Sequence, residues 1–323
     1  MRNRIALTCG IGSKWFTSTF HMSETAATTT TAPSKRRVFA SRLFSTLLLW
    51  SLLTLAFLQW QNTWLIIAIT GFFGVAGAVE YFRLLRNDPH ARSFNALGFV
   101  ICITYWVAVL WYTTTQHRAP PMEFDLAALT ASVHGSFILC YRHQLEGAST
   151  LQRIFNTVFG TVYTVIFFGF MIRLLYFHGD GKGITDIFLV LFLIAVTKFS
   201  DMGAYVVGVL FGKHKMIPHI SPAKSWEGFV GAFIGSFAAA AVVLWAAPPE
   251  KLAPLTWMHG MILAPVLCAT AITGDLAESV LKRCVAIKDS GHALPGIGGI
   301  LDLTDSLLFT APVFYFYLSA IAR

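Results

Sequence analysis

The chain has 323 residues, of which 55% are hydrophobic and only 12% are charged. Because a soluble globular domain carries about 25% charged residues, this composition excludes a soluble protein. The formal net charge of +8 arises from short basic clusters between apolar blocks, which argues against nucleic acid as a partner and favours anionic lipid headgroups.

We expect neither a signal peptide nor a disulfide framework. Residues 1–37 are polar and threonine-rich, which predicts a disordered tail, and Met22 offers a second translation start beside Met1. The cysteines show no paired spacing, so we expect packing residues, not disulfides or zinc ligands. They are Cys9, Cys102, Cys140, Cys268 and Cys284.

The rest of the chain is a series of apolar blocks of roughly 18 to 25 residues, the length that crosses about 30 Å of hydrocarbon. We therefore predict an all-α, polytopic transmembrane protein with about nine spans. These spans are residues 42–60, 64–82, 95–113, 126–141, 154–177, 185–211, 228–246, 257–281 and 303–321.

The orientation follows from lysine and arginine, which are enriched in cytoplasmic loops. With the N-terminus inside, the tail and the loops after spans 2, 4, 6 and 8 hold about 18 of the 24 Lys and Arg residues. We therefore predict a multi-pass protein of the cytoplasmic or inner membrane with a cytoplasmic N-terminus. The loops after spans 6 and 8 then lie on the cytoplasmic side together and can form one site.

Span 6 contains the ionisable residues Lys198 and Asp201, which are three residues apart on one helix face. An ionised side chain at this depth costs about 2.5 to 3.5 kcal/mol on insertion scales, so each needs a partner or a function. Both a structural ion pair and a polar substrate cavity explain them.

Span 8 carries a polar stripe with spacings of i, i+3, i+4 and i+7 on an otherwise apolar helix. Such a stripe must face protein or water. Its acids could hold a hard cation, and the basic pair that ends it could hold a polyanion. The stripe consists of Asp275, Glu278, Ser279 and Lys282, and Arg283 follows it.

The segment before span 9 contains one proline and three glycines at residues 295–299, so its backbone N–H groups can approach phosphate oxygens. Asp302 and Asp305 follow on the predicted first turn of span 9. They could cap that helix or, together with the acids of span 8, form one acidic site.

The loop after span 6 places three cations, Lys213, Lys215 and Lys224, on the same side as those acids. Ser221 or Ser225 is expected to cap span 7. Carboxylates that can hold a metal beside cations that can hold phosphates are the requirements of phosphoryl or nucleotidyl transfer.

Three segments resemble the phosphatidate cytidylyltransferases, also called CDP-diacylglycerol synthases. Residues 279–305, SVLKRCVAIKDSGHALPGIGGILDLTD, look like the family signature, and residues 201–213, DMGAYVVGVLFGK, match a second motif. Residues 221–228, SPAKSWEG, resemble the family's Ser-Pro-Lys-Lys-Thr-Trp-Glu-Gly motif. The resemblance covers roughly residues 198–306, whereas the first five spans match only in hydrophobicity.

The chain departs from the family pattern at four positions. Ile297 stands where His is usual, Leu303 where Arg is usual and Ala223 where Lys is common, while Ser225 replaces Thr and keeps the hydroxyl. The acids and most of the basic residues of the pattern remain, which indicates a divergent branch of the family.

The resemblance implies that CTP and phosphatidate give CDP-diacylglycerol and pyrophosphate, with residues 38–180 as N-terminal transmembrane helices and 181–323 as the catalytic region. It implies catalytic roles for Asp275, Asp302, Lys282 and Arg283, and a Mg²⁺ site, with or without a second cation, at Asp275, Asp302 and Asp305. Lys198 is placed as a supporting or cavity-lining group, and a homodimer is left open. Substrate-binding roles fall to Ser221, Lys224, Glu227, Ser279, Lys288, Asp289, Gly298, Gly299 and Asp201.

Two alternative classes remain open on the sequence. A related membrane CTP-dependent transferase or kinase that acts on another lipid would share the acids and basic loops. An ion-coupled transporter could use Lys198, Asp201 and Asp275 as a relay, but it predicts charges near mid-membrane and an internal repeat, and no repeat is evident. A CDP-alcohol phosphotransferase fits poorly because its motif spacing is absent.

Overall fold

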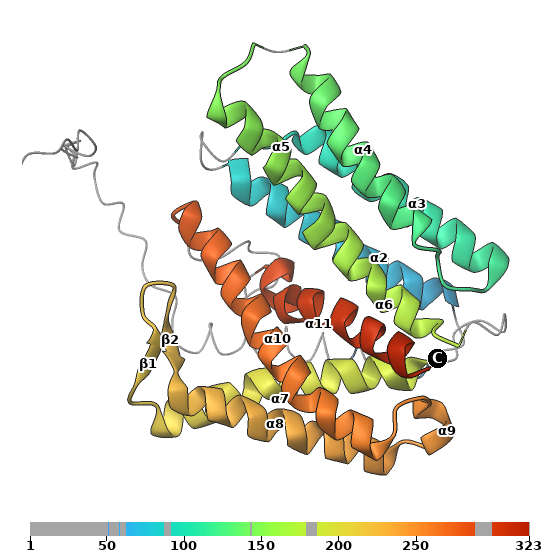
Figure 1. Ribbon diagram of the computed structural model, residues 1–323, viewed down its shortest axis with the longest axis vertical. Coiled ribbons are helices and arrows are strands. Elements are labelled where there is room, and N and C mark those ends of the chain that lie inside the picture. The colour runs from blue at the N-terminus through green and yellow to red at the C-terminus, as the bar shows by residue number, and fades with distance from the viewer. Residues whose placement is uncertain are drawn as a thin grey trace, which may run out of the picture.

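The structure is a computed structural model that describes residues 51, 58, 63–86, 92–142, 144–178, 186–287 and 299–322. It is a helical bundle with one small hairpin (Figure 1). In chain order the elements are α2 (Thr63–Arg86), α3 (Asn95–Gln116), α4 (Glu123–Cys140), α5 (Ala148–Gly160), the π-helix η1 (Thr161–Ile166), α6 (Phe167–Leu175), α7 (Ile187–Phe211), β1 (Lys215–Ile217), β2 (Ser221–Ser225), α8 (Trp226–Ala246), α9 (Pro249–Leu252), α10 (Trp257–Cys284) and α11 (Ile300–Ile321).

Six stretches of helix in the described part of the chain are long and apolar enough to cross a membrane. They are α2, α3, the continuous run from α5 through η1 to α6, α7, α8 and α10. The prediction of an all-α, multi-pass protein is thus confirmed in its main feature. Predicted spans 4 and 9 are the helices α4 and α11, which are not among these six, and predicted span 1 lies almost wholly outside the described residues.

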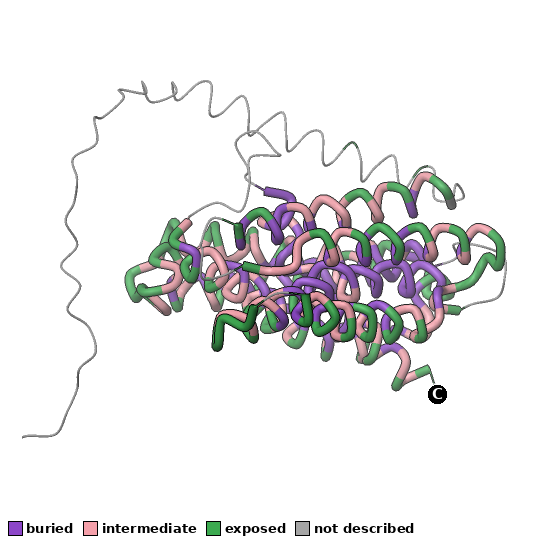
Figure 2. Tube along the Cα trace, turned by 90° about the horizontal axis from the view of Figure 1, so that it is seen from above, coloured by how far each residue is buried: buried purple, intermediate pink, exposed green. Residues whose placement is uncertain are grey.

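Large apolar side chains cover the outer faces of the bundle. Figure 2 shows buried residues running through the middle and exposed residues on the outside. On α7 and α8, for example, Val209 is 66% exposed and Ile234 is 61% exposed. Contiguous exposed apolar surface is unfavourable in water, so these faces suit contact with lipid.

The last helix, α11, lies inside the bundle and packs against α10, α6, α2 and α7. Eleven of its residues are buried, among them Asp305, Ser306 and Thr310. Because protein surrounds α11, it tolerates polar residues that a lipid-facing helix would exclude. The position of α11 inside the bundle therefore agrees with the polar residues that it carries.

Helices α7 and α8 lie side by side in close contact (Figure 1). Glycines at the contact let the two backbones approach, as is common between membrane helices. A Cβ on Gly203 would collide with the carbonyl oxygen of Gly231, and a Cβ on Gly235 would collide with that of Phe199. The close approach fixes α7, which carries Lys198 and Asp201, against α8.

An antiparallel hairpin of β1 and β2 joins α7 to α8, with Lys215 opposite Ser225 and Ile217 opposite Ser221. The all-α prediction missed this hairpin. Of the two serines predicted to cap span 7, Ser225 is the cap: its hydroxyl accepts a hydrogen bond of 3.1 Å from the Gly228 amide.

A buried ionic cluster fastens α3, α4 and α6 together. The Arg173 side chain is 1% exposed, and its guanidinium lies 2.9 Å from the Asp125 carboxylate. The Tyr105 hydroxyl donates to the other Asp125 oxygen at 2.9 Å. Because each ion in this cluster is paired, the bundle can bury it.

The cysteines are free in the described part of the chain. Cys102, Cys140 and Cys268 are buried, as packing residues should be, whereas Cys284 is exposed at the end of α10. The packing prediction is therefore wrong for Cys284. Cys9, together with the tail predicted to be disordered, lies outside the described residues.

Candidate active site

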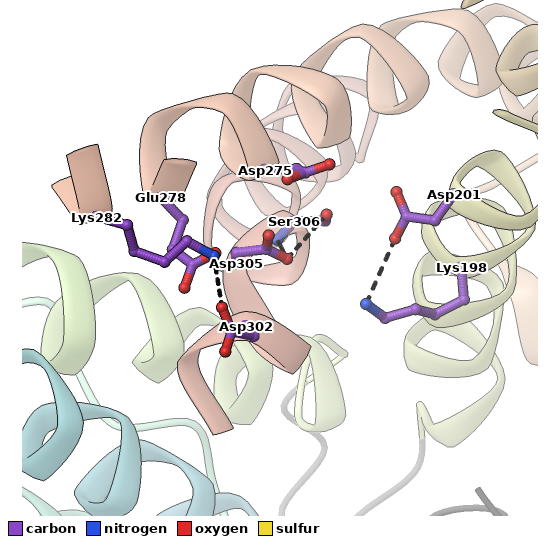
Figure 3. A pocket seen from close by; sticks show the side chains of 8 residues that line it. All are labelled: Lys198, Asp201, Asp275, Glu278, Lys282, Asp302, Asp305 and Ser306. Atoms are coloured by element: carbon purple, nitrogen blue, oxygen red, sulfur yellow. Dashed lines mark hydrogen bonds and ion pairs between the residues drawn. The ribbon is translucent and has the colours of Figure 1, made fainter. Parts of the chain in front are cut away.

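A cavity of about 400 Å³ opens where α7, α10 and α11 meet, and its lining is almost entirely charged. Figure 3 shows the lining side chains, with Lys282 and Lys198 on opposite sides and Asp275 and Asp305 between them. The lining residues are Lys198, Asp201, Asp275, Glu278, Lys282, Asp302, Asp305 and Ser306.

Helix α10 contributes three residues of its predicted polar stripe to the cavity: Asp275, Glu278 and Lys282. The fourth, Ser279, does not line it. The stripe comes close to α11 because Gly274 has no side chain: a Cβ there would lie 2.7 Å from the Asp305 carbonyl oxygen. Helical spacing and one close approach thus bring the acids of both helices together.

Lys282 bridges α10 and α11. Its Nζ lies 2.7 Å from the Glu278 carboxylate and 2.6 Å from that of Asp302. Glu278 is 1% exposed, and its Oε1 has no hydrogen-bond partner among the described residues. One ammonium group therefore serves two acidic side chains from different helices.

The acids of α11 are held at its first turns. Asp302 Oδ2 accepts a 2.7 Å hydrogen bond from the Gly299 amide, and its other oxygen is the one bound by Lys282. Asp305 accepts from the amide and the hydroxyl of Ser306. Both carboxylates face the same cavity as Asp275.

Helix α7 closes the opposite wall with Lys198 and Asp201. The Lys198 ammonium donates to the Leu303 carbonyl oxygen at 2.8 Å and lies 3.5 Å from Asp201. Both explanations given for this pair therefore hold in part, because the two residues form an ion pair and also line the cavity. Lys198 thus supports the backbone of α11 at Leu303.

The hairpin brings a third lysine to the site. Lys224 of β2 lies 2.8 Å from Asp275 of α10. Arg283 Nε donates to the Ile220 carbonyl oxygen at 3.3 Å, which ties the hairpin to the end of α10. The loop after span 6 thus contacts the end of α10, where the loop after span 8 begins, and Arg283 itself lies outside the cavity. Residues 288–298 of the loop after span 8 lie outside the described residues.

A second cavity of about 340 Å³ adjoins the first and shares Asp201 and Asp275 with it. Its walls come from α7, α8, α10 and the hairpin, and they combine Ser221 and Lys224 with apolar side chains. The apolar members include Met216, Phe229 and Ile272. Two neighbouring spaces, one charged and one partly apolar, therefore share Asp201 and Asp275 in their walls.

The other residues predicted for the site are placed elsewhere. Glu227 lies outside both cavities, where its carboxylate is 2.7 Å from the His214 ring and accepts from the His214 amide, which closes the base of the hairpin. Gly299 caps α11. Lys288, Asp289, Gly298 and Ile297 lie outside the described residues.

The three predicted metal ligands, Asp275, Asp302 and Asp305, line one cavity. Within the described ranges, however, no three His, Cys, Asp or Glu side chains are arranged to hold a metal ion together. Lysines pair with two of the three acids. The donor set still fits Mg²⁺, because proteins usually hold this ion through one or two carboxylates and leave the rest of its shell to water and substrate phosphates.

The sequence from residue 40 to residue 321 matches the Cytidylyltransferase family. The chain belongs to this family. The match covers both the N-terminal helices and the cavity, and it confirms the resemblance drawn from the three motifs.

Individual relatives agree with the family match. The chain is 32% identical to the uncharacterized protein YnbB of Escherichia coli strain K12, over 60% of this chain and 64% of that protein. It is 43% identical to the phosphatidate cytidylyltransferase of Mycobacterium leprae, over 49% of this chain and 47% of that protein. The phosphatidate cytidylyltransferase of Bacillus subtilis is 31% identical over 75% of this chain and 86% of its own length. The chain thus spans less than two thirds of the first two relatives and most of the third.

Proposed function

We propose that this protein is an integral membrane phosphatidate cytidylyltransferase, which forms CDP-diacylglycerol and pyrophosphate from CTP and phosphatidate in phospholipid synthesis. One observation carries the proposal: acids and lysines from α7, α10 and α11 line a single cavity in a chain of the cytidylyltransferase family. The choice of substrates follows from the relatives that are named phosphatidate cytidylyltransferases.

The reaction exchanges one phosphoanhydride bond for another. A phosphate oxygen of phosphatidate attacks the α-phosphorus of CTP and forms a new P–O bond. The bond between the α-phosphorus and the bridging oxygen to the β-phosphate breaks, and pyrophosphate leaves with that electron pair. The attacking monoester is already anionic, so repulsion between two anions and charge growth on pyrophosphate dominate the barrier.

The positively charged lysines of the site can reduce the repulsion between the two anionic substrates. Lys198 and Lys282 line the charged cavity, and Lys224 lines the second cavity beside it. Each lysine is already hydrogen-bonded or ion-paired to fixed groups of the protein. Ammonium groups held in place beforehand stabilise developing charge without reorganising during the reaction. Exchange of an Asp partner for a phosphate oxygen would keep each lysine paired when substrate binds.

The proposal includes a Mg²⁺ ion held by Asp275 together with Asp302 or Asp305, with or without a second cation. When bound, this ion would supply Lewis-acid neutralisation of the phosphates. The pairing of Asp275 with Lys224 and of Asp302 with Lys282 keeps the acids compensated before substrate and metal arrive. The second cavity offers room for the other substrate beside the charged one.

The proposal extends to the arrangement in the membrane. We place the N-terminus and the hairpin in the cytoplasm, count nine spans and assign the protein to the cytoplasmic or inner membrane, on the strength of the lysine and arginine distribution. CTP is a cytoplasmic nucleotide, and it would reach the cavity from the side of the hairpin. A homodimer is compatible with this arrangement.

The proposal can be tested with CTP that carries a ³²P label at the α-position in one sample and at the γ-position in another. Purified protein is incubated with each sample, Mg²⁺ and phosphatidate, and the lipid is extracted. A cytidylyltransferase moves only the α-label into lipid and releases pyrophosphate in equal amount. Transfer of the γ-label would identify a CTP-dependent kinase, and no transfer of either label to phosphatidate would contradict the proposed function.

A lipid panel separates the cytidylyltransferase from its close rivals. The same α-label assay is repeated with polyprenyl phosphate and with lysophosphatidate in place of phosphatidate. We expect the highest kcat/KM for phosphatidate. A clear preference for another lipid phosphate would keep the chemistry and overturn the assigned substrate.

A further inference from the structure

The start of α11 lacks a capping side chain of its own. Its N-cap is Gly299, so no side chain is available there to accept a hydrogen bond from the first free amides of the helix. Asp302 accepts from the Gly299 amide and so supplies half of a capping box. The free amides of the first turn therefore need an acceptor from outside the helix.

Glu80 of α2 supplies that acceptor. Its Oε2 accepts a 2.8 Å hydrogen bond from the Leu301 amide, across 221 residues of sequence. Glu80 is 6% exposed, and Gly77, one turn earlier on the same face of α2, lies against the Leu301 side chain. The positive end of the α11 dipole favours a carboxylate in this place.

The contact acts on the residues that form the cavity. Leu301 directly precedes Asp302, whose carboxylate pairs with Lys282 at 2.6 Å, and Asp305 follows one turn later. An anchor on the Leu301 amide therefore sets the position at which both acids enter the site. Displacement of a catalytic group by about 1 Å can reduce turnover by about 100-fold.

Packing alone does not account for this carboxylate. Glu80 Oε1 is buried and has no hydrogen-bond partner among the described residues, which is unfavourable. A buried ion is weak evidence for a stabilising role, because an apolar side chain of similar volume is often equally or more favourable for folding. The contact that the structure does show for Glu80 is the hydrogen bond from the Leu301 amide, at the start of α11.

We infer that Glu80 is a positioning residue for nucleotidyl transfer, which acts by holding the first turn of α11 and, through it, Asp302 and Asp305. This inference rests on the proposed function. It assigns part of the active site's geometry to α2, in the half of the chain where the sequence suggested only hydrophobic spans.

Two substitutions at position 80 separate positioning from folding. Glu80→Met keeps the volume and removes the acceptor, whereas Glu80→Gln keeps a neutral oxygen that can still accept from Leu301. We expect Glu80→Met to lower kcat by at least about 10-fold with little change in the KM for CTP. Glu80→Gln should recover most of the activity, and the melting temperature of Glu80→Met should stay near that of the wild type.

The matched control is Glu123→Met, the same change at an exposed position on α4. It should leave kcat unchanged. Glu80→Met that is as active as this control would overturn the inference. So would a loss of activity that merely follows a loss of folded protein, or Glu80→Gln that is no better than Glu80→Met.

Hydrogen exchange tests the contact without using the reaction. In Glu80→Met, amides at residues 300–306 should exchange faster in deuterated buffer, while those in the middle of α10 should exchange as in the wild type. Unchanged exchange at residues 300–306 would contradict the inference that Glu80 holds the first turn of α11. If wild-type protein moved no α-label from CTP to lipid, the proposed function would fail, but this readout would still decide the role of Glu80 in placing α11.

Discussion

At the residue scale, the charge balance of the cavity depends on Lys282. Its ammonium group is the shared partner of Glu278 and Asp302, which come from different helices. Glu278 is almost fully buried, so it needs a cation close by. Lys282 therefore stabilises the site before substrate binds, and the same ammonium group can also contact a phosphate.

Replacement of Lys282 with methionine should therefore affect both stability and turnover. Removal of one partner from a buried ion pair costs about 3 to 5 kcal/mol, because the remaining charges are uncompensated. We expect a clearly lower melting temperature in detergent and a loss of transfer activity of at least about 100-fold. The matched control is Lys251→Met, at an exposed position on α9. Equal behaviour of the two variants would contradict the role given to Lys282.

Some residues of the site could be predicted from helical spacing, and others could not. Asp275, Glu278 and Lys282 recur on one face of a helix, and all three line the cavity. Glu80 lies within predicted span 2, where a charged residue indicates a partner or a function. Its partner, Leu301, is 221 residues away in the sequence. Local spacing carries no information about such a pair.

At the element scale, the packing of α7 on α8 depends on glycines. Gly231 lies so close to α7 that a Cβ there would be 2.5 Å from the Gly203 carbonyl oxygen and from Val207 Cβ. By contrast, a Cβ on Gly77 of α2 would have its nearest neighbour, Leu301 Cδ1, at 3.9 Å. The same substitution should therefore have opposite consequences at these two positions.

Gly231→Ala should destabilise the protein by about 1 to 3 kcal/mol, because α7 and α8 must move apart to admit the methyl group. Gly77→Ala should be neutral or slightly stabilising, since alanine favours helix over glycine. Thermal unfolding in detergent measures both effects. A Gly231→Ala variant as stable as Gly77→Ala would show that the two helices are not packed this closely.

The helices could be predicted because apolar blocks of spanning length leave few alternatives, and eight of the nine predicted spans coincide with helices of the structure. The hairpin could not. Its strands have three and five residues, and β2 contains Pro222. Contacts outside the strands hold it in place, such as that of Glu227 with His214, and no short sequence window shows them.

At the scale of the whole molecule, the two halves predicted from the sequence share one core. The buried cluster extends from Ile66 in α2 to Leu318 in α11. Helix α11, which carries Asp302 and Asp305, packs on α2 and α6 as well as on α7 and α10. The N-terminal helices therefore support the candidate active site directly, and the division at residue 180 stays a prediction.

The orientation of this bundle in the membrane can be measured with one introduced cysteine at a time, in a variant in which Cys9 and Cys284 are serine and the remaining cysteines are buried. Lys215→Cys lies on the hairpin, and Arg118→Cys lies between α3 and α4, which we assign to the opposite side. In intact cells, a membrane-impermeant maleimide should label position 118 and should reach position 215 only after the membrane is opened. The reverse pattern would contradict the cytoplasmic placement of the hairpin.

The central claim is that Asp275, where the two cavities meet, takes part in metal-dependent transfer from CTP to lipid. The most direct measurement is the rate at which Asp275→Asn moves the α-label of CTP into phosphatidate across a range of Mg²⁺ concentrations. Because the Asp275 side chain is 38% exposed, the variant should fold normally. We expect a rate at least about 100-fold below that of the wild type at every Mg²⁺ concentration. A folded variant with near-normal turnover would contradict the claim.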